Sequence, residues 1–421
     1  MSFYISYKND FGTKTIINGD TEEIFDLDRI DKDDYTHCFI LRADYEHSHE
    51  GLLKYLNDFK QWSDEMINRK EGKIDYRKFY NDTVAVKYNF TNTLTGNAKK
   101  LYDSIQCIDI KELCWINKCN NGGLMYCDPG TYECHGVDFK MFYPRILGSK
   151  TDCFTFRFPT KRGKQFKLKK LNFDEPLRFG YYHAMITSDH PDRLKLFSFS
   201  KNNVYTNYSL EFAHNQLSEF GFKIELIKGD NYNAYLYDSE CIIESHKIFN
   251  TWYYKMSSMR KDFPKNRLLK FLTSSLSGHL TSYNVEAVNI KTIDPERDAN
   301  LCWFTEDPDG MPKGCEEAIK NVVRFDNSDN DYYEVINIKK PMEFNVGRFK
   351  AFLMSFGRNL TATAGMIDLE SVVRIQTDGI VFKTKQDFTK FNDVPKNFIY
   401  DDDKTSGRIK FKTVNSYNKE I

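Results

Sequence analysis

Residues 372–382 read VVRIQTDGIVF, and residues 137–147 read VDFKMFYPRIL. Each stretch joins a carboxylate to an apolar run, Asp378 in the first stretch and Asp138 in the second. A strand that ends at an aspartate holds anionic oxygens on a rigid core element, which suits the binding of divalent metal. The two stretches together therefore predict a two-metal site for phosphoryl transfer.

The chain has 421 residues, of which 40% are hydrophobic and 29% are charged. This length and composition are typical of a globular protein with a sizeable core and two or three subdomains. Basic and acidic residues number 60 each, so any affinity for nucleic acid must come from local basic patches. No apolar run is long enough for a membrane span and no signal peptide begins the chain, so we expect an intracellular protein with no membrane partner.

Half of the ten cysteines gather in one short stretch beside His135: Cys107, Cys114, Cys119, Cys127 and Cys134. An intracellular location predicts that all ten are thiols. Their spacing lacks a C-x2-C pair, so scattered core thiols are favoured over a zinc site.

Periodicity predicts the order of elements. A helical stretch covers residues 52–70, and a strand, a turn and a second strand follow from residue 124, which places Asp138 at a strand end. Two helices are expected at 243–258 and 264–281, separated by Pro264, and another at 347–366. Residues 377–379 then form the turn of a hairpin, and residues 290–345 form a surface insertion rich in Asp, Pro and Asn.

A basic stretch at residues 153–172 leaves two alternatives open. Its cations alternate with aromatic residues as in a strand: Arg157, Lys161, Arg162, Lys164, Lys167, Lys169 and Lys170. They form either a surface for backbone phosphates or a solvated hairpin.

Three ordered motifs carry a resemblance to the family-B DNA polymerases. The stretch DFKMFYP at 138–144 resembles motif A, D-x-x-S-L-Y-P, and KFLTSSLSG at 270–278 is similar to motif B, K-x3-N-S-x-Y-G. QTDG at 376–379 resembles motif C, D-T-D-S. Gly122 and Gly123 resemble the Y-x-G-G element of the protein-primed branch, and SGRIKFK at 406–412 resembles the later G-K-x-K segment. The nearest types are viral or plasmid enzymes, here without an exonuclease and with a truncated thumb.

The resemblance implies an α+β fold, with a palm built on an antiparallel sheet and a helical fingers hairpin. Residues 1–120 form a mixed N-terminal region of unassigned role, 121–242 the first part of the palm, 243–281 the fingers, and 282–421 the second part of the palm. The implied activity is that of a DNA-directed DNA polymerase, which adds deoxynucleotides to a primer 3′-hydroxyl in a viral or plasmid replication compartment.

The resemblance also implies the site residues. Two Mg²⁺ or Mn²⁺ ions would bind the catalytic Asp138 and Asp378, with the backbone of Phe139 as a further ligand. Tyr143 would reject a 2′-hydroxyl, and Lys270 would contact the incoming triphosphate. The other expected nucleotide-binding residues are Met141, Phe142, Ser274, Lys255, Arg260 and Lys265. The expected DNA-binding residues are Gly122, Gly123, Gly278 and Lys410.

Several residues depart from the family pattern. Gln376 replaces the first aspartate of motif C, Ser274 and Ser277 replace the motif B Asn and Tyr, and Arg145 stands where motif A usually has Ser. Expected partners are primed DNA template, deoxynucleotides, and other replication subunits that supply a thumb, an exonuclease or a primer. The departures keep an alternative open: a catalytically degenerate polymerase-like subunit that binds DNA or a replication partner. A two-carboxylate nuclease would explain neither Lys270 nor Tyr143.

Overall fold

The computed structural model describes residues 90–419 with gaps, together with four short strands between Tyr4 and Ile40. The larger gaps cover residues 229–231, 290–323, 326–331 and 389–391. The helix expected at 52–70 and most of the insertion expected at 290–345 therefore lie outside the described residues. The chain divides into two compact units, Met1–Leu94 with Tyr254–Leu276 and Thr95–Tyr253 with Ser277–Ile421.

The first unit contains a four-stranded sheet in the order β3-β2-β1-β4. Its strands are β1 (Tyr4–Lys8), β2 (Lys14–Asn18), β3 (Ile24–Asp26) and β4 (Cys38–Ile40). Strand β1 pairs antiparallel with β2 and parallel with β4. The same unit holds the end of α9 (His246–Asp262) and most of α10 (Arg267–His279).

The second unit is larger and combines helices with four of the described sheets. Its helices are α4 (Gly96–Asp103), α5 (Ile110–Cys119), α6 (Phe142–Gly148), α7 (Arg193–Leu196), α8 (Asn207–Asn215) and α12 (Phe349–Gly365). Short 3₁₀ turns cover Ser218–Phe220, Ser239–Cys241, Asn345–Arg348 and Met366–Ser371. No described helix is both long and apolar enough to cross a membrane.

A six-stranded antiparallel sheet in the order β20-β19-β6-β18-β17-β5 carries the predicted site. Its strands are β5 (Met125–Cys127), β6 (Gly130–Phe139), β17 (Val372–Gln376), β18 (Gly379–Phe382), β19 (Ile399–Thr413) and β20 (Ser416–Lys419). The sheet curls, so that Arg374 of β17 reaches the hairpin near the opposite edge. There its Nε donates to the Val414 carbonyl at 2.7 Å. Cys134, Val373, Val381, Ile409 and Phe411 fill the inside of the curl.

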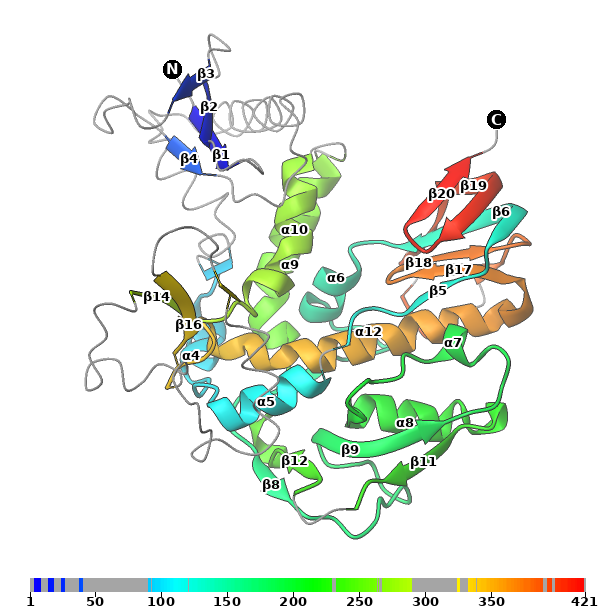
Figure 1. Cartoon of the computed structure of the whole chain (residues 1–421), viewed down its shortest axis with the longest axis horizontal. Coiled ribbons are helices and arrows are strands. Elements are labelled where there is room, and N and C mark those ends of the chain that lie inside the picture. Colours follow the sequence, from blue (N-terminus) through cyan, green and yellow to red (C-terminus); the bar gives the residue numbers. More distant parts are fainter. Residues whose placement is uncertain are drawn as a thin grey trace. The chain divides into compact units, whose positions relative to one another are not determined.

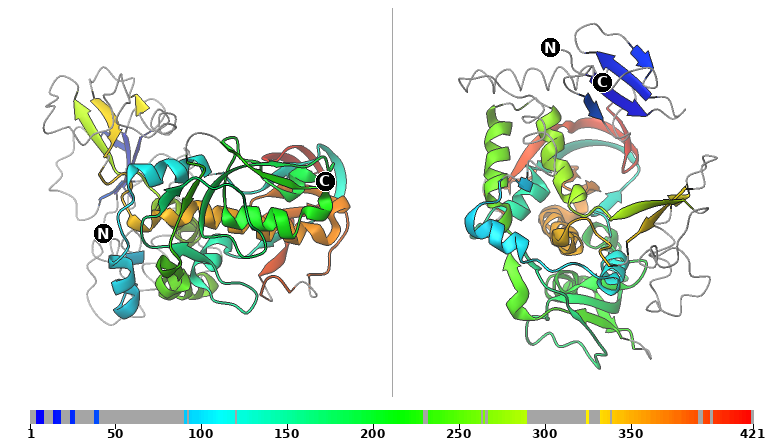
Figure 2. Two further views of the ribbon diagram at one scale, coloured as in Figure 1. Left: turned by 90° about the horizontal axis from the view of Figure 1, so that it is seen from below. Right: turned by 90° about the vertical axis from the view of Figure 1, so that its left-hand side faces the viewer.

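Helix α12 lies between this curled sheet and a second sheet, in Figure 1 and in the views of Figure 2. The second sheet has the order β10-β9-β12-β8, and β11 also pairs with β9. Its strands are β8 (Lys164–Phe166), β9 (Gly180–Thr187), β10 (Val204–Thr206), β11 (Lys223–Leu226) and β12 (Ala234–Leu236). Most residues of α12 are buried, so neighbours pack against the helix on several sides. Its small residues allow these neighbours to approach closely.

The remaining strands form two small sheets. Strand β7 (Arg157–Pro159) pairs with β13 (Ile242–Glu244), and β14 (Val285–Asn289), β16 (Tyr332–Ile336) and β15 (Arg324–Phe325) form a three-stranded sheet. The hairpin proposed for residues 153–172 is wrong, since β7 pairs with β13 and β8 with β12. Local alternation indicated strands, but their paired residues lie 68 to 87 positions away in the sequence.

The α+β class, with an antiparallel sheet and a helix pair, is confirmed. The hairpin turn after Gln376 and the helix expected at 347–366 are also present. The first helix of the pair begins at His246 rather than at residue 243, because residues 242–244 form β13. The four-part domain division stays a prediction.

The described cysteines are not all thiols. Cys114 is disulfide-bonded, so the prediction that all ten are thiols is wrong at this position. Cys107, Cys119, Cys127, Cys134, Cys153 and Cys241 are free thiols. Cys119 and Cys134 are buried, as expected of core thiols.

Candidate active site

The two aspartates meet at one end of the curled sheet. Asp138 lies directly opposite Gly379, the residue after Asp378, and the Phe139 amide donates to the Asp378 carbonyl at 3.0 Å. Directly opposite residues in an antiparallel pair have Cα atoms about 4.5–5.5 Å apart. The fold therefore brings residues 240 positions apart in the sequence to adjacent backbone positions.

One row of opposite residues crosses five strands at this end of the sheet. The register aligns Met125, Gln376, Gly379, Asp138 and Tyr400 in that order. Directly opposite side chains project from the same face of a sheet. Gly379, which has no side chain, thus leaves the middle of the row open beside Asp138.

The turn that carries Asp378 is strained. Thr377 has a φ of +58°, in the left-handed region that a β-branched residue rarely adopts. Its amide donates to the Leu124 carbonyl at 2.9 Å, and the Thr361 hydroxyl donates to its carbonyl at 2.7 Å. Met141, three residues after Asp138, is also left-handed, with a φ of +53°. Strained backbone held by its surroundings is concentrated at functional sites, so its presence beside both aspartates favours a site here.

Tyr143, the expected sugar gate, packs on α12. A side chain at Gly357 would meet the Tyr143 ring at 2.9 Å, so only glycine permits this approach of α6. Burial raises the pKa of the Tyr143 hydroxyl and the Asp378 carboxylate adds to the rise, while Arg358 opposes it. Asp378 and Arg358 are therefore each within electrostatic reach of the Tyr143 hydroxyl.

Gln376 does not stand free as a metal ligand. Its Oε1 accepts a hydrogen bond from Arg374 Nη2, and its Nε2 donates to Asn415 Oδ1 at 2.8 Å. Arg374 is buried and stacks on the Tyr417 ring at 4.9 Å. The residue that replaces the motif C aspartate thus ties the turn to the β19–β20 hairpin.

Arg358 was missed in the sequence, although it is one of only two charges in a largely apolar helix. It is 6% exposed, and its Nη1 donates to the carbonyls of Asn121 and Gly122 at 2.9 and 2.7 Å. Burial lowers the pKa of its guanidinium. Arg358 therefore holds the glycine pair against the sheet.

Tyr400 and Asn415 were also missed, and no local pattern marks them. The Tyr400 hydroxyl donates to Asp138 Oδ2 at 3.1 Å. Burial raises the pKa of this hydroxyl, and the carboxylates of Asp138, Asp402 and Asp378 raise it further. The phenol is consequently protonated at neutral pH, and both aspartates expected to be catalytic lie near it.

The expected fingers residues fall on α9 and α10. Lys270, Ser274 and Gly278 are exposed and spaced four residues apart, so they form one stripe of α10. Leu269, Leu272 and Leu276 are buried on another side of the helix. Lys255 and Arg260 are half-buried on α9, and Lys265 lies outside the described residues. Lys410, expected to bind DNA, is exposed on β19.

Gly122 and Gly123 differ in their surroundings, which provides a matched test. A Cβ at Gly123 would lie 2.6, 2.8 and 2.9 Å from Oγ1, Cγ2 and Cβ of Thr377, whereas one at Gly122 would meet nothing within 4 Å. Rotation of Thr377 does not relieve the clash, because its Cβ is itself too close. We expect Gly123→Ala to slow primer extension about 10²-fold, since displacement near a reacting centre has effects of that size.

Gly122→Ala is the packing control for this prediction: its methyl group would meet no protein atom within 4 Å, so it should lose far less of the primer-extension rate than Gly123→Ala. Single-turnover primer extension measures both variants, and chemical unfolding shows whether Gly123→Ala loses only the ~1–3 kcal/mol typical of overpacking. Equal rates for the two variants would contradict the placement of the turn.

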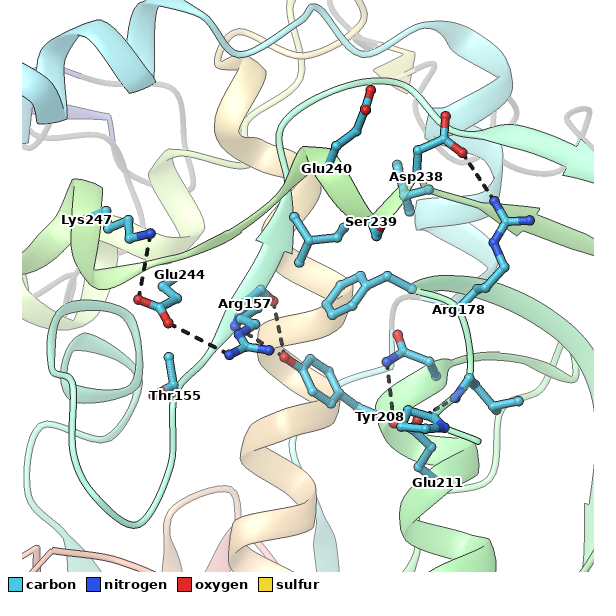
Figure 3. A pocket seen from close by; sticks show the side chains of 16 residues that line it. Thr155, Arg157, Arg178, Tyr208, Glu211, Asp238, Ser239, Glu240, Glu244 and Lys247 are labelled. Atoms are coloured by element: carbon cyan, nitrogen blue, oxygen red, sulfur yellow. Dashed lines mark hydrogen bonds and ion pairs between the residues drawn. The ribbon is translucent and has the colours of Figure 1, made fainter. Parts of the chain in front are cut away.

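A large cavity of about 990 Å³ contains neither aspartate and is shown in Figure 3. Arg157 and Lys247 both point toward Glu244, at 3.8 and 3.9 Å, and Arg178 pairs with Asp238 at 3.3 Å. The basic side chains that line this cavity are thus already paired with carboxylates. Lys161, Arg162 and Lys164 also have acidic partners within 4.0 Å, which weakens the phosphate-surface alternative for residues 153–172.

The donors present fit a hard divalent cation. Carboxylate and backbone oxygens are the ligands that Mg²⁺ and Mn²⁺ prefer, and Asp138 and Asp378 supply them at adjacent positions. Within the described part of the chain, no group of three or more His, Cys, Asp or Glu side chains is placed to hold a metal. A metal site here must therefore use the two aspartates, backbone oxygens and the substrate's own phosphates.

Comparison with known proteins found matches in structure alone, since no family profile and no curated protein matches the sequence. The phi29 DNA polymerase complexed with primer-template DNA, a post-translocation binary complex, matches over 99% of this chain and 86% of that chain, with a TM-score of 0.50 and 11% identity. The chain has a polymerase-like fold. The ternary complex of phi29 DNA polymerase with primer-template DNA and incoming nucleotides matches over 86% of this chain and 65% of that chain, with a TM-score of 0.50 and 14% identity.

A third match is phi29 DNA polymerase complexed with single-stranded DNA, with a TM-score of 0.49, 11% identity and coverage of 89% of this chain and 60% of that chain. In two of these three comparisons, the chain spans less than two thirds of the matched polymerase chain. The expectation of a polymerase-like fold is confirmed, while the family-B subtype and the site residues stay predictions.

Proposed function

We propose that this chain is a template-directed DNA polymerase of the family-B type, which adds deoxynucleotides to a primer 3′-hydroxyl by two-metal phosphoryl transfer. The observation that carries the proposal is the register of the curled sheet, which pairs Asp138 with the neighbour of Asp378. Two aspartates at adjacent backbone positions, on a polymerase-like fold, suit the chemistry that an attack on an α-phosphate requires.

The two metal ions, when bound, would activate the 3′-hydroxyl and neutralise the leaving pyrophosphate. Asp138 and Asp378 would hold them, with the Phe139 backbone as a further ligand. Tyr143, fixed against Gly357, would bound the sugar site. Met141 and Phe142 at the start of α6, together with Lys270, Ser274, Lys255, Arg260 and Lys265, would bind the triphosphate.

We propose that the template strand passes the glycine pair. A hollow of about 660 Å³ borders this segment, and its lining includes Gly122, Gly123, Phe199 and Lys412. Aromatic side chains that stack with bases and lysines that contact phosphates are the usual components of single-strand binding. Gly278 and Lys410 are the other proposed DNA contacts.

Primer extension on a primed single-stranded template tests this function. Purified protein with Mg²⁺ or Mn²⁺ should add the nucleotide complementary to the template and should reject a ribonucleotide. Failure to add any nucleotide with either metal, on templates with several primer lengths, would contradict the enzyme proposal.

A second candidate is a polymerase-like subunit that binds DNA without turnover. The observation that favours it is the engagement of Gln376 by Arg374 and Asn415, which leaves the turn one carboxylate short of the family pattern. Such a subunit would bind primed DNA yet show no nucleotide-dependent Mn²⁺ binding.

Restoring the family aspartate tests the role of Gln376. In Gln376→Asp the new carboxylate would face Arg374 and lose the donor to Asn415, so it would form an ion pair rather than bind metal. We expect the primer-extension rate to stay within about tenfold of wild type, which corresponds to ~1.4 kcal/mol of transition-state stabilisation. A larger gain would show that Gln376 alone limits the site. Single-turnover kinetics provide the measurement.

A further inference from the structure

The first carboxylate of the site has a hydrogen-bond donor that no motif identifies. Tyr400 lies directly opposite Asp138 in the β6–β19 ladder, and its hydroxyl donates to Asp138 Oδ2 at 3.1 Å. The Tyr400 ring is 46% exposed, so burial of an apolar surface does not explain its position. The hydrogen bond is the feature that gives this side chain a specific orientation.

The backbone of Tyr400 is itself tied to motif A. The Phe398 carbonyl accepts a hydrogen bond from the Lys140 amide at 2.7 Å, and the Phe398 ring packs against Phe139 with centroids 5.2 Å apart. Arg145, the departure from the motif A pattern, also lies over the Phe398 ring, 4.5 Å from its centre. The start of β19 is therefore fixed relative to the turn that follows Asp138.

The need for such a donor follows from Gln376. Its amide is engaged by Arg374 and Asn415, so the turn brings a single carboxylate, that of Asp378, to the end of the sheet beside Asp138. With two carboxylates, a wrong rotamer of either one removes half of the ligand charge. A hydroxyl that donates to Oδ2 restricts the rotamer of the carboxylate and leaves its negative charge in place to bind metal.

We propose that Tyr400 is a positioning residue that orients the Asp138 carboxylate for divalent metal. This inference rests on the proposed function. In other metalloproteins, removal of a donor that orients a metal ligand lowers metal affinity or activity about 10–100-fold. Tyr400→Phe should lower the affinity for divalent metal by a factor in that range. The fold should be unaltered, since the substitution removes a single oxygen from a half-exposed ring.

The test is Mn²⁺ affinity of the full-length chain, measured by electron paramagnetic resonance of free Mn²⁺ without DNA. Tyr400→Phe should weaken binding about 10–100-fold, and the Mn²⁺ concentration for half-maximal primer extension should rise by the same factor. The maximal rate at saturating Mn²⁺ should recover. Tyr417→Phe is the matched control, because phenylalanine keeps the ring contacts with Arg374 and Phe411 on the same sheet. Thermal unfolding of each variant checks the fold.

A double-mutant cycle separates positioning from general packing. In an Asp138→Asn background, Tyr400→Phe should produce no further loss of Mn²⁺ affinity, whereas a packing defect would still add to it. Wild-type affinity in Tyr400→Phe, alongside normal Mn²⁺ binding and primer extension by the unmodified chain, would overturn this inference alone. Absence of both Mn²⁺ binding and primer extension in the unmodified chain would overturn the proposed function and this inference together.

Discussion

Asp378→Asn should lower the single-turnover rate of primer extension by about 10³-fold or more. A metal ion contributes several kcal/mol of charge stabilisation in the transition state, and each ~1.4 kcal/mol corresponds to a factor of ten. Asparagine keeps the shape of the side chain and the backbone turn, so the loss would report the missing charge. Asp138→Asn should show a loss of the same order, because both carboxylates would serve one site under the proposed function.

The matched control is Asp401→Asn. Asp401 is exposed on β19 next to Tyr400, but it pairs opposite Val137 and so projects from the other face of the sheet than Asp138. The primer-extension rate of Asp401→Asn should match that of the unmodified chain. A loss in Asp401→Asn equal to that in Asp378→Asn would indicate that general negative charge, and not a shared site, supports the reaction.

Arg348→Met should destabilise the fold by about 3–5 kcal/mol, as expected when one partner of a buried ion pair is removed. Arg348 and Glu112 are both fully buried, and two hydrogen bonds of 2.8 and 2.9 Å join them. The Tyr237 hydroxyl also donates to Glu112 at 2.8 Å. Methionine fills the space of the side chain but leaves the Glu112 carboxylate buried without its cation. The measurement is denaturant unfolding, compared with a typical total stability of about 5–15 kcal/mol.

Two comparisons complete this prediction. Lys99→Met removes an exposed ion pair with Asp103, 3.2 Å long, and should cost less than ~1 kcal/mol. The double variant Glu112→Leu with Arg348→Met should recover much of the lost stability, because no charge then remains buried. A cost for Arg348→Met as small as that for Lys99→Met would show that α5 and α12 are not held together by this pair.

The parts of the site that follow from local pattern could be predicted from the sequence. An apolar run that ends at Asp138 predicts the end of a strand. A second apolar run interrupted by the turn residues 377–379 predicts a hairpin. Helix α12 was predictable from its long apolar periodicity. These signals depend on neighbours within a few residues, and the structure confirms the elements that they predict.

The contacts that orient these elements could not be predicted in this way. Tyr400 and Asp138 are 262 residues apart, and Arg348 and Glu112 are 236 apart, so no short pattern joins them. Arg358 illustrates a different limit. Its charge in an apolar helix indicates a buried cation, but its acceptors are backbone carbonyls, which every residue provides. The sequence therefore indicates the strand ends, and the long-range pairing of the sheet decides which side chains meet.

The central claim is that Asp138 and Asp378 share one two-metal site. Crystals of the chain with primed DNA, a non-hydrolysable deoxynucleotide and Mn²⁺ would locate the ions directly by anomalous scattering. We expect two manganese peaks about 3.5–4 Å apart. Each peak should lie within coordination distance of both aspartates, or of one aspartate and the nucleotide phosphates. Manganese peaks at other residues, or a nucleotide bound without metal beside either aspartate, would contradict it.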